Sequence, residues 1–147
     1  MPKITVGVYV PGISTDWTFI DFLLDTGAAS TSIHPMDAVG KLGIDPDALA
    51  DKQRWTDRVG RFGVGGEATY FRVPTRYLFQ SDTGQMLLHS TYGYLGHLDR
   101  SKPRNQTLES LESLIGWDLL QIFRIVADYS QRRIELHPTV HLNPYTP

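Results

Sequence analysis

The sequence contains no cysteine among its 147 residues. This absence excludes disulfide scaffolds, zinc sites built on thiolates and thiol nucleophiles. Neither sign of charge dominates, because 14 lysines and arginines stand against 16 aspartates and glutamates. A near-neutral chain lacks the strongly basic face that is typical of a dedicated nucleic-acid binder, so we expect no nucleic-acid partner.

Long hydrophobic runs are also missing. No stretch approaches the roughly 20 apolar residues that a membrane-spanning helix needs, and the first residues do not form the apolar core of a signal peptide. We therefore expect a soluble, cytoplasmic protein without a membrane partner. The length fits one domain, which we place at residues 1–137. Residues 138–147 contain three prolines and are expected to form an extended or disordered tail.

Short apolar segments separated by turns make up most of the sequence. This spacing favours an all-β fold, either a barrel or a sandwich. Helical patterns are short and follow proline or glycine. The strands are expected at Ile4–Val10, Trp17–Leu24, Arg58–Val64, Ala68–Val73, Arg76–Gln80, Gln85–Ser90, Arg124–Asp128 and Arg132–Leu136, and the helix candidates at Pro35–Leu42, Pro46–Arg54 and Leu119–Phe123. The polar segment 97–113 is expected to be a surface loop.

The tripeptide Asp25-Thr26-Gly27 is the most informative motif. An apolar strand ends there in a carboxylate, a hydroxyl and a glycine, and Ala28 follows. The same three letters recur at residues 82–84, but with polar neighbours on both sides. The second copy is therefore expected to be an exposed hairpin turn, whereas Asp25 is expected at the mouth of a buried strand.

Two further segments accompany this motif in order. A glycine-rich hairpin is expected around Gly63, Val64, Gly65 and Gly66, and the apolar segment Leu114-Ile115-Gly116 leads into Trp117-Asp118-Leu119-Leu120. Together the three segments resemble the retropepsin-like aspartic proteases, the single-domain relatives of the retroviral enzyme. The resemblance extends from about residue 4 to residue 136.

The resemblance implies a small closed acid-protease barrel with one or two short helices. It implies that Asp25 is the catalytic residue and that Thr26, Gly27 and Ala28 support its loop. Leu114, Ile115 and Gly116 would brace that loop from behind, and the glycine-rich hairpin would close over the substrate as a flap. A threonine matching Thr26 hydrogen-bonds to the partner's loop in that family.

Two departures from the family pattern concern the loop and its surroundings. Viral members carry an ion pair at the positions of Ala29 and Trp117, and we expect apolar packing to replace it here. The chain is also longer between Asp25 and Gly65, and the extra piece at residues 45–56 is expected to be decoration more than a part of the cleft. Leu23, Val64 and Ile115 are candidates for the walls of substrate pockets.

Hydrolysis by this route needs two carboxyls that share one water. Two carboxyls about 3 Å apart cannot both ionise, so one acts as base and the other as acid. A chain with one catalytic aspartate must borrow the second, which predicts a homodimer with Asp25 from each subunit. The substrate would be a peptide or protein bound in extended conformation. Pairing of Asp25 with Asp82 or Asp118 within one chain is the less favoured alternative.

Other chemistries find weaker support. The five histidines lack neighbours at metal-ligand spacing, so no metal or other cofactor is expected. Ser30, Ser32 and His34 lie too close together in sequence to indicate a serine nucleophile with its base. Two alternatives to the protease stay open: a silent retropepsin-like module that binds peptides or dimerises, and an unrelated β-sandwich with an accidental motif.

Overall fold

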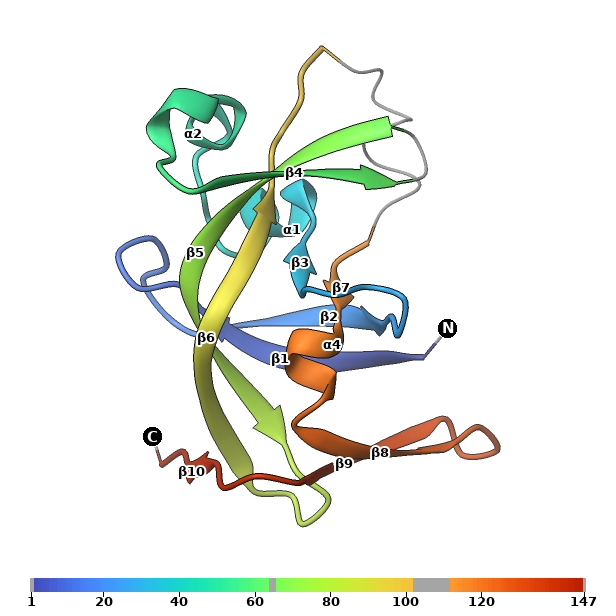
Figure 1. Ribbon diagram of the computed structural model, residues 1–147. Coiled ribbons are helices and arrows are strands. Elements are labelled where there is room, and N and C mark those ends of the chain that lie inside the picture. The colour runs from blue at the N-terminus through green and yellow to red at the C-terminus, as the bar shows by residue number, and fades with distance from the viewer. Residues whose placement is uncertain (1, 64–65, 102–111, 147) are drawn as a thin grey trace.

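The structure is a computed structural model that describes residues 2–63, 66–101 and 112–146. Strands dominate it, and the helices are short (Figure 1). The strands are β1 (Lys3–Tyr9), β2 (Thr18–Leu24), β3 (Ser32–Ile33), β4 (Arg58–Gly63), β5 (Gly66–Gln80), β6 (Met86–Gly96), β7 (Leu114–Ile115), β8 (Phe123–Asp128), β9 (Arg133–Pro138) and β10 (Asn143–Pro144). The helices are α1 (Pro35–Gly40), α2 (Pro46–Ala50), the 3-10 turn η1 (Lys52–Arg54) and α4 (Trp117–Leu120). The expected all-β class is confirmed.

The main sheet closes on itself as a ring of paired strands. Its order is β10-β6-β3-β7-β2-β1-β5-β4, and an additional pairing of β6 with β5 completes the ring. The ring is not a regular barrel, because β3 and β7 contribute only two residues each. Most neighbours are antiparallel, but β7 runs parallel to β2 and β3 runs parallel to β6. These two parallel pairings place the loop after β2 against the segment after β7.

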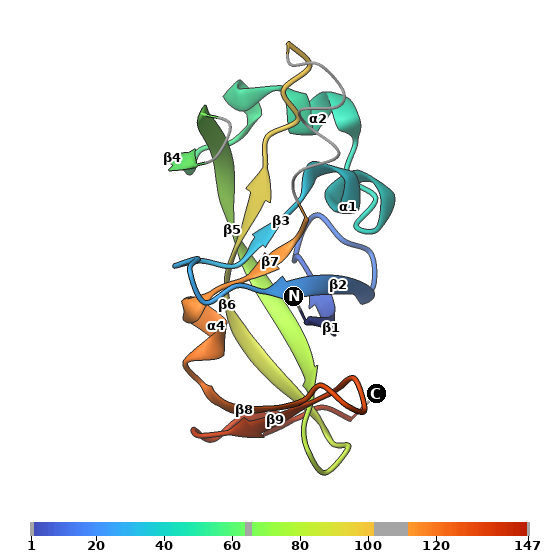
Figure 2. The same ribbon diagram turned by 90° about the vertical axis from the view of Figure 1, so that its right-hand side faces the viewer.

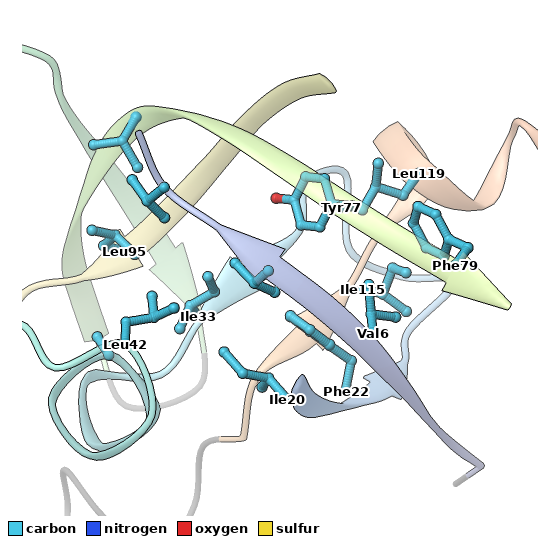
Figure 3. Packing of buried hydrophobic residues seen from close by; sticks show 14 of the residues in the cluster. Val6, Ile20, Phe22, Ile33, Leu42, Tyr77, Phe79, Leu95, Ile115 and Leu119 are labelled. Atoms are coloured by element: carbon cyan, nitrogen blue, oxygen red, sulfur yellow. The ribbon is translucent and has the colours of Figure 1, made fainter. Parts of the chain in front are cut away.

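A single hydrophobic core fills the ring. Alternate residues of β1 and β2 point inward, as the period-two pattern requires, so that Val6, Ile20 and Phe22 are almost completely buried. Figure 3 shows Val6 and Phe22 beside Ile115 of β7, and Leu119 of α4 belongs to the same cluster. Full burial of such a side chain stabilises a fold by about 1.5–3 kcal/mol. The core therefore fixes the two segments that flank the Asp25 loop.

Two expected strands prove to be one. The segments 68–73 and 76–80 join into β5, and Pro74 lies inside it, opposite Tyr92 of β6. β6 likewise continues to Gly96, six residues beyond the expected Ser90. Long pairing between β5 and β6 overrides the local turn signal of the proline. The prediction of two separate strands at residues 68–73 and 76–80 is therefore wrong.

The extra piece at residues 45–56 forms α2 and η1 and packs on the sheet. The Trp55 ring stacks on the buried Phe71 ring of β5 with 4.7 Å between centroids. Its indole N–H donates to the Ala48 carbonyl over 2.9 Å, and the Leu98 N–H donates to the Leu49 carbonyl. The piece therefore braces the root of the β4–β5 hairpin instead of decorating the surface.

The C-terminal part adds a two-stranded sheet and an extended arm. β8 and β9 form an antiparallel hairpin outside the ring. Figures 1 and 2 both show this hairpin in the lower part of the molecule, just above the turn between β5 and β6. The tail that follows is extended: β10 pairs with β6, and Tyr145 meets the Trp17 ring edge to face. Among the residues that the structure describes, no helix is long and apolar enough to cross a membrane.

Candidate active site

Asp25 follows directly on the last residue of β2. Its N–H donates to the Ile115 carbonyl over 3.0 Å, which extends the parallel pairing of β2 with β7 by one bond. The Gly27 N–H donates to Asp25 Oδ1 over 2.9 Å, and the Ala28 N–H donates to the Asp25 carbonyl. These bonds make an Asx turn. They fix the carboxylate, which is half-buried, at the base of an exposed loop tip formed by Thr26 and Gly27.

The segment Leu114-Ile115-Gly116 lies directly behind this loop. Leu114 and Ile115 pair with the last two residues of β2. A Cβ on Gly116 would lie 2.7 Å from the carbonyl oxygens of both Ala28 and Ser30. Only glycine allows the two backbones to approach so closely. The structure thus brings together the two segments that the sequence singled out.

A second contact, which sequence reasoning missed, joins Thr31 to Asp118. The Thr31 N–H donates to Asp118 Oδ2 over 2.9 Å, and its hydroxyl donates to Asp118 Oδ1 over 2.7 Å. The same hydroxyl accepts the Gly116 N–H over 3.2 Å. We call Thr31, Gly116 and Asp118 the loop clamp. Thr31 is fully buried, and no local sequence signal marks it, because its partners lie more than 80 residues away.

Trp117 does not pack as the sequence suggested. Its side chain is 51% exposed, and Ala29 is exposed as well. The indole N–H instead donates to the Thr26 carbonyl over 2.5 Å, while the backbone N–H donates to the Ala28 carbonyl. The prediction that apolar packing replaces the viral ion pair is therefore wrong: a hydrogen bond to the tip of the loop replaces it.

The two other aspartates considered as partners of Asp25 have different roles in the structure. Asp118 is held by Thr31, as described above. Asp82 lies in the exposed turn between β5 and β6, where its Oδ2 is 3.4 Å from His137 Nδ1. The turn assignment for residues 82–84 is confirmed, and Gly84 has a φ of +83°. Within the described part of the chain, no hydrogen bond links the Asp25 carboxyl to another carboxyl.

The glycine-rich hairpin lies at the end of the β4–β5 pair. Gly63 and Gly66 form the last residue pair of its ladder. Val64 and Gly65 lie outside the described residues, so the expected flap tip and one of the expected pocket walls are not described. Of the other two candidate walls, Leu23 is half-buried, whereas Ile115 is 1% exposed and belongs to the core. Ile115 is thus wrong as a pocket wall of the single chain.

Two titratable side chains share the Asp118 carboxylate as a neighbour. Burial lowers the pKa of His89, and the negative charge of Asp118 partly offsets this effect. Burial raises the pKa of the Tyr77 hydroxyl, and Asp118 acts in the same direction. The Tyr77 hydroxyl donates to the Tyr92 carbonyl over 3.0 Å. Both shifts favour the uncharged forms of the two groups near neutral pH.

Metal and serine chemistry gain no support from the geometry. Residues 2–63, 66–101 and 112–146 contain no group of three or more histidine, aspartate or glutamate side chains that could hold a metal ion. His34 is buried, and its Nδ1 accepts the Met36 N–H at the start of α1. That contact is a helix cap and not the orientation of a catalytic base.

Comparisons with known proteins find similarity to solved structures but no relative in sequence. No family model matches the chain, and no curated protein matches it. The chain is similar to a solved structure described as EIAV protease complexed with the inhibitor HBY-793. The two chains share 19% sequence identity, the match covers 82% of this chain and 85% of that one, and the TM-score is 0.44.

Proposed function

We propose that the protein is a homodimeric aspartic endopeptidase that hydrolyses peptide bonds between two Asp25 carboxyls. The observation that carries the proposal is the placing of Asp25. It ends a buried strand, and the Gly27 N–H holds one of its oxygens. The loop tip beside it is exposed. A second copy can therefore approach the carboxylate from the side of the loop tip.

The chemistry follows from the sharing of one proton. When two Asp25 carboxyls lie about 3 Å apart, one stays protonated and the other ionised. The ionised carboxylate takes a proton from a bound water, and the protonated one donates its proton to the oxygen of the scissile carbonyl. The resulting tetrahedral diol collapses when the amide nitrogen is protonated, and the C–N bond breaks. This is general acid–base catalysis without a covalent intermediate.

The loop around Asp25 supplies orientation. The Gly27 N–H holds one oxygen of the Asp25 carboxyl in place. The loop clamp and the Trp117 indole fix the backbone on either side. A carboxyl held in this way needs little rearrangement when the partner arrives, which lowers the cost of reaching the reactive geometry.

The substrate in this proposal is a peptide or protein segment in extended conformation. It would lie between the Asp25 loops and the β4–β5 hairpin, and its backbone would pair with strand edges while alternate side chains fill pockets. The glycines Gly63 and Gly66 at the end of the ladder permit a close approach of backbone to backbone. The flap role of this hairpin remains part of the proposal.

The decisive experiment compares Asp25→Asn with Asp82→Asn on a fluorogenic peptide library. Both variants change an aspartate of an Asp-Thr-Gly tripeptide, but only the first removes a carboxyl of the proposed pair. Asp25→Asn should reduce cleavage by about a thousandfold or more, within the range that a general acid–base group contributes, and should leave the circular dichroism spectrum unchanged. Equal activity of the Asp25→Asn variant and the wild type would refute the proposal.

A silent module that binds peptides or dimerises is the second candidate. The observation that favours it is the loss of the viral ion pair at Ala29 and Trp117, which changes the surroundings of the loop. Such a module would bind extended peptides without turnover. Peptide binding by fluorescence anisotropy, together with no cleavage by the wild type at concentrations where it is dimeric, would favour this candidate over the enzyme.

A further inference from the structure

The Trp117 side chain reaches from the first residue of α4 to the Asp25 loop. In Figure 2 the start of α4 lies next to the loop that follows β2. Trp117 is 51% exposed, so its ring is not a part of the core. Its one polar atom, the indole nitrogen, donates its proton to the Thr26 carbonyl oxygen over 2.5 Å. This hydrogen bond is the feature of Trp117 that needs an explanation.

The Thr26 carbonyl belongs to the same peptide group as the Gly27 N–H. The group is planar and trans, so its C=O and N–H point in opposite directions. At one end the oxygen accepts the Trp117 indole N–H. At the other end the Gly27 N–H donates to Asp25 Oδ1 over 2.9 Å. Two hydrogen bonds joined by one peptide group therefore connect the indole to the Asp25 carboxyl.

Rotation of this peptide group is the movement that would take the Gly27 N–H away from the carboxyl. Glycine opposes such a rotation less than other residues do, because it has no Cβ, and both residues of the tip are exposed. The indole bond opposes it, since a turned peptide group no longer presents its oxygen to Trp117. Hydrogen bonds in a chain also polarise one another, so the bond accepted by the oxygen strengthens the bond given by the N–H.

The other bonds between α4 and the loop hold different peptide groups. The backbone N–H of Trp117 donates to the Ala28 carbonyl over 2.9 Å, and that of Asp118 donates to the Ala29 carbonyl over 3.2 Å. Both bonds use the backbone and do not require a tryptophan. Among the residues whose structure is described, no second donor reaches the Thr26 carbonyl. The side chain of Trp117 thus has a role that the docking of α4 does not fulfil.

We propose that Trp117 is a positioning residue for the Asp25 carboxyl: its indole N–H fixes the Thr26–Gly27 peptide group, and this group fixes Asp25 Oδ1. The inference rests on the proposed function and deepens it. Both proton transfers of that reaction require a carboxyl oxygen within hydrogen-bond reach of the water or of the scissile carbonyl. A side chain that orients this oxygen acts on the chemical step and not on the binding of the peptide, so its loss lowers kcat and leaves KM unchanged.

Trp117→Phe tests this role, because it keeps an aromatic ring and removes the donor. We expect kcat to fall about tenfold, as expected for a misplaced reacting group, with KM within about twofold of the wild type. Trp17→Phe is the kinetic control: the Trp17 ring contacts Tyr9 and Tyr145 on another part of the fold. An unchanged kcat in Trp117→Phe would overturn the proposal.

The Gly27 amide gives a readout that does not depend on activity. Loss of the bond to the Thr26 oxygen weakens the bond of the Gly27 N–H. Its amide proton signal should therefore move upfield in a proton–nitrogen correlation spectrum and exchange faster with solvent. Trp55→Phe is the matched control, because the Trp55 indole also donates to a backbone carbonyl, that of Ala48, over 2.9 Å. It should leave the Gly27 signal unchanged.

An isosteric replacement separates the donor from the ring. Benzothienylalanine at position 117 carries sulfur in place of the indole N–H and keeps the fused ring, with its effect on nearby signals. We expect it to reproduce the lower kcat and the faster Gly27 exchange of Trp117→Phe, also if the phenylalanine variant folds poorly. Wild-type kcat and wild-type Gly27 exchange in this protein would show that the donor has no positioning role.

Weaker dimerisation would also lower turnover, because Trp117 lies exposed beside the loop tip. Kinetics at rising protein concentration, with sedimentation velocity alongside, distinguish the two causes. A positioning role predicts that the loss of kcat persists where both the wild type and Trp117→Phe are fully dimeric. Recovery of the wild-type kcat at those concentrations would overturn the proposal.

The outcomes separate this inference from the proposed function. Cleavage that depends on Asp25, combined with wild-type kcat and Gly27 exchange in the position-117 variants, would leave the enzyme standing and remove the inference. No cleavage by the wild type, combined with an upfield shift and faster exchange of Gly27 in those variants, would remove the enzyme. The control of the peptide group by Trp117 would then still stand.

Discussion

The loop clamp gives the sharpest test of how this chain holds its candidate catalytic loop. The Asp118 carboxylate accepts two hydrogen bonds from Thr31, over 2.9 Å and 2.7 Å. A hydrogen bond to a charged group contributes about 1.5–3 kcal/mol, and an unsatisfied buried donor is costly. Asp118 is half-buried and partly hydrated, so the two contributions should not add fully. We expect Asp118→Ala to lower the free energy of unfolding by about 2–4 kcal/mol.

Asp118→Asn is the informative companion of that variant. The amide oxygen can still accept the Thr31 N–H, and the amide N–H can donate to the Thr31 hydroxyl once this hydroxyl turns round. This variant should therefore cost no more than about 1 kcal/mol, roughly the difference between a charged and a neutral hydrogen bond. A difference of this kind identifies hydrogen bonding, and not the negative charge alone, as the stabilising interaction.

Urea denaturation and thermal melting measure the effect. For a chain of this length, 1 kcal/mol corresponds to about 2–4 °C in Tm, so Asp118→Ala should melt roughly 5–15 °C lower than the wild type. If Asp118→Ala unfolds within about 0.5 kcal/mol of the wild type, the clamp does not hold the loop. If Asp118→Asn is as unstable as Asp118→Ala, the charge matters more than the geometry argued above.

Two further predictions concern the surroundings of the clamp. Gly116→Ala places a methyl group 2.7 Å from the carbonyl oxygens of Ala28 and Ser30. Overpacking should lower the free energy of unfolding by about 1–3 kcal/mol. Peptide cleavage should be affected more than stability, which thermal melting and a kinetic assay together measure. Burial lowers the pKa of His89 in the folded chain. The unfolded chain therefore binds a proton on His89 at a higher pH than the folded chain does. The free energy of unfolding should consequently fall as the pH drops below about 6.5. His89→Gln should flatten this loss between pH 7.5 and 5, whereas a variant of the exposed His141 should retain it.

Local sequence pattern predicted most of the strands and the contrast between the two Asp-Thr-Gly tripeptides. Alternation in β1 and β2 is clear because one face of each strand is buried. The apolar residues before Asp25 and the polar residues around Asp82 reflect a buried strand end and an exposed turn. In both cases the information lies within a few residues of the motif, so the sequence alone carries it.

Contacts between distant segments were beyond the reach of local pattern. Thr31 lies between Ser30 and Ser32 with nothing to distinguish it, and its partner Asp118 is 87 residues away. The Trp117 indole bond to the Thr26 carbonyl spans 91 residues. The continuation of β5 through Pro74 depends on its pairing with β6. Each of these features arises from the meeting of two segments, which neither segment encodes by itself.

The way in which the loop is held bears on the cost of assembling the proposed site. Its own chain fixes the loop from three directions: by the close approach at Gly116, by the Thr31–Asp118 bonds and by the Trp117 indole. The tip itself remains exposed. A preorganised surface loses less conformational entropy on association than a mobile one does. In the proposed homodimer the two Asp25 loops would therefore meet without being reshaped.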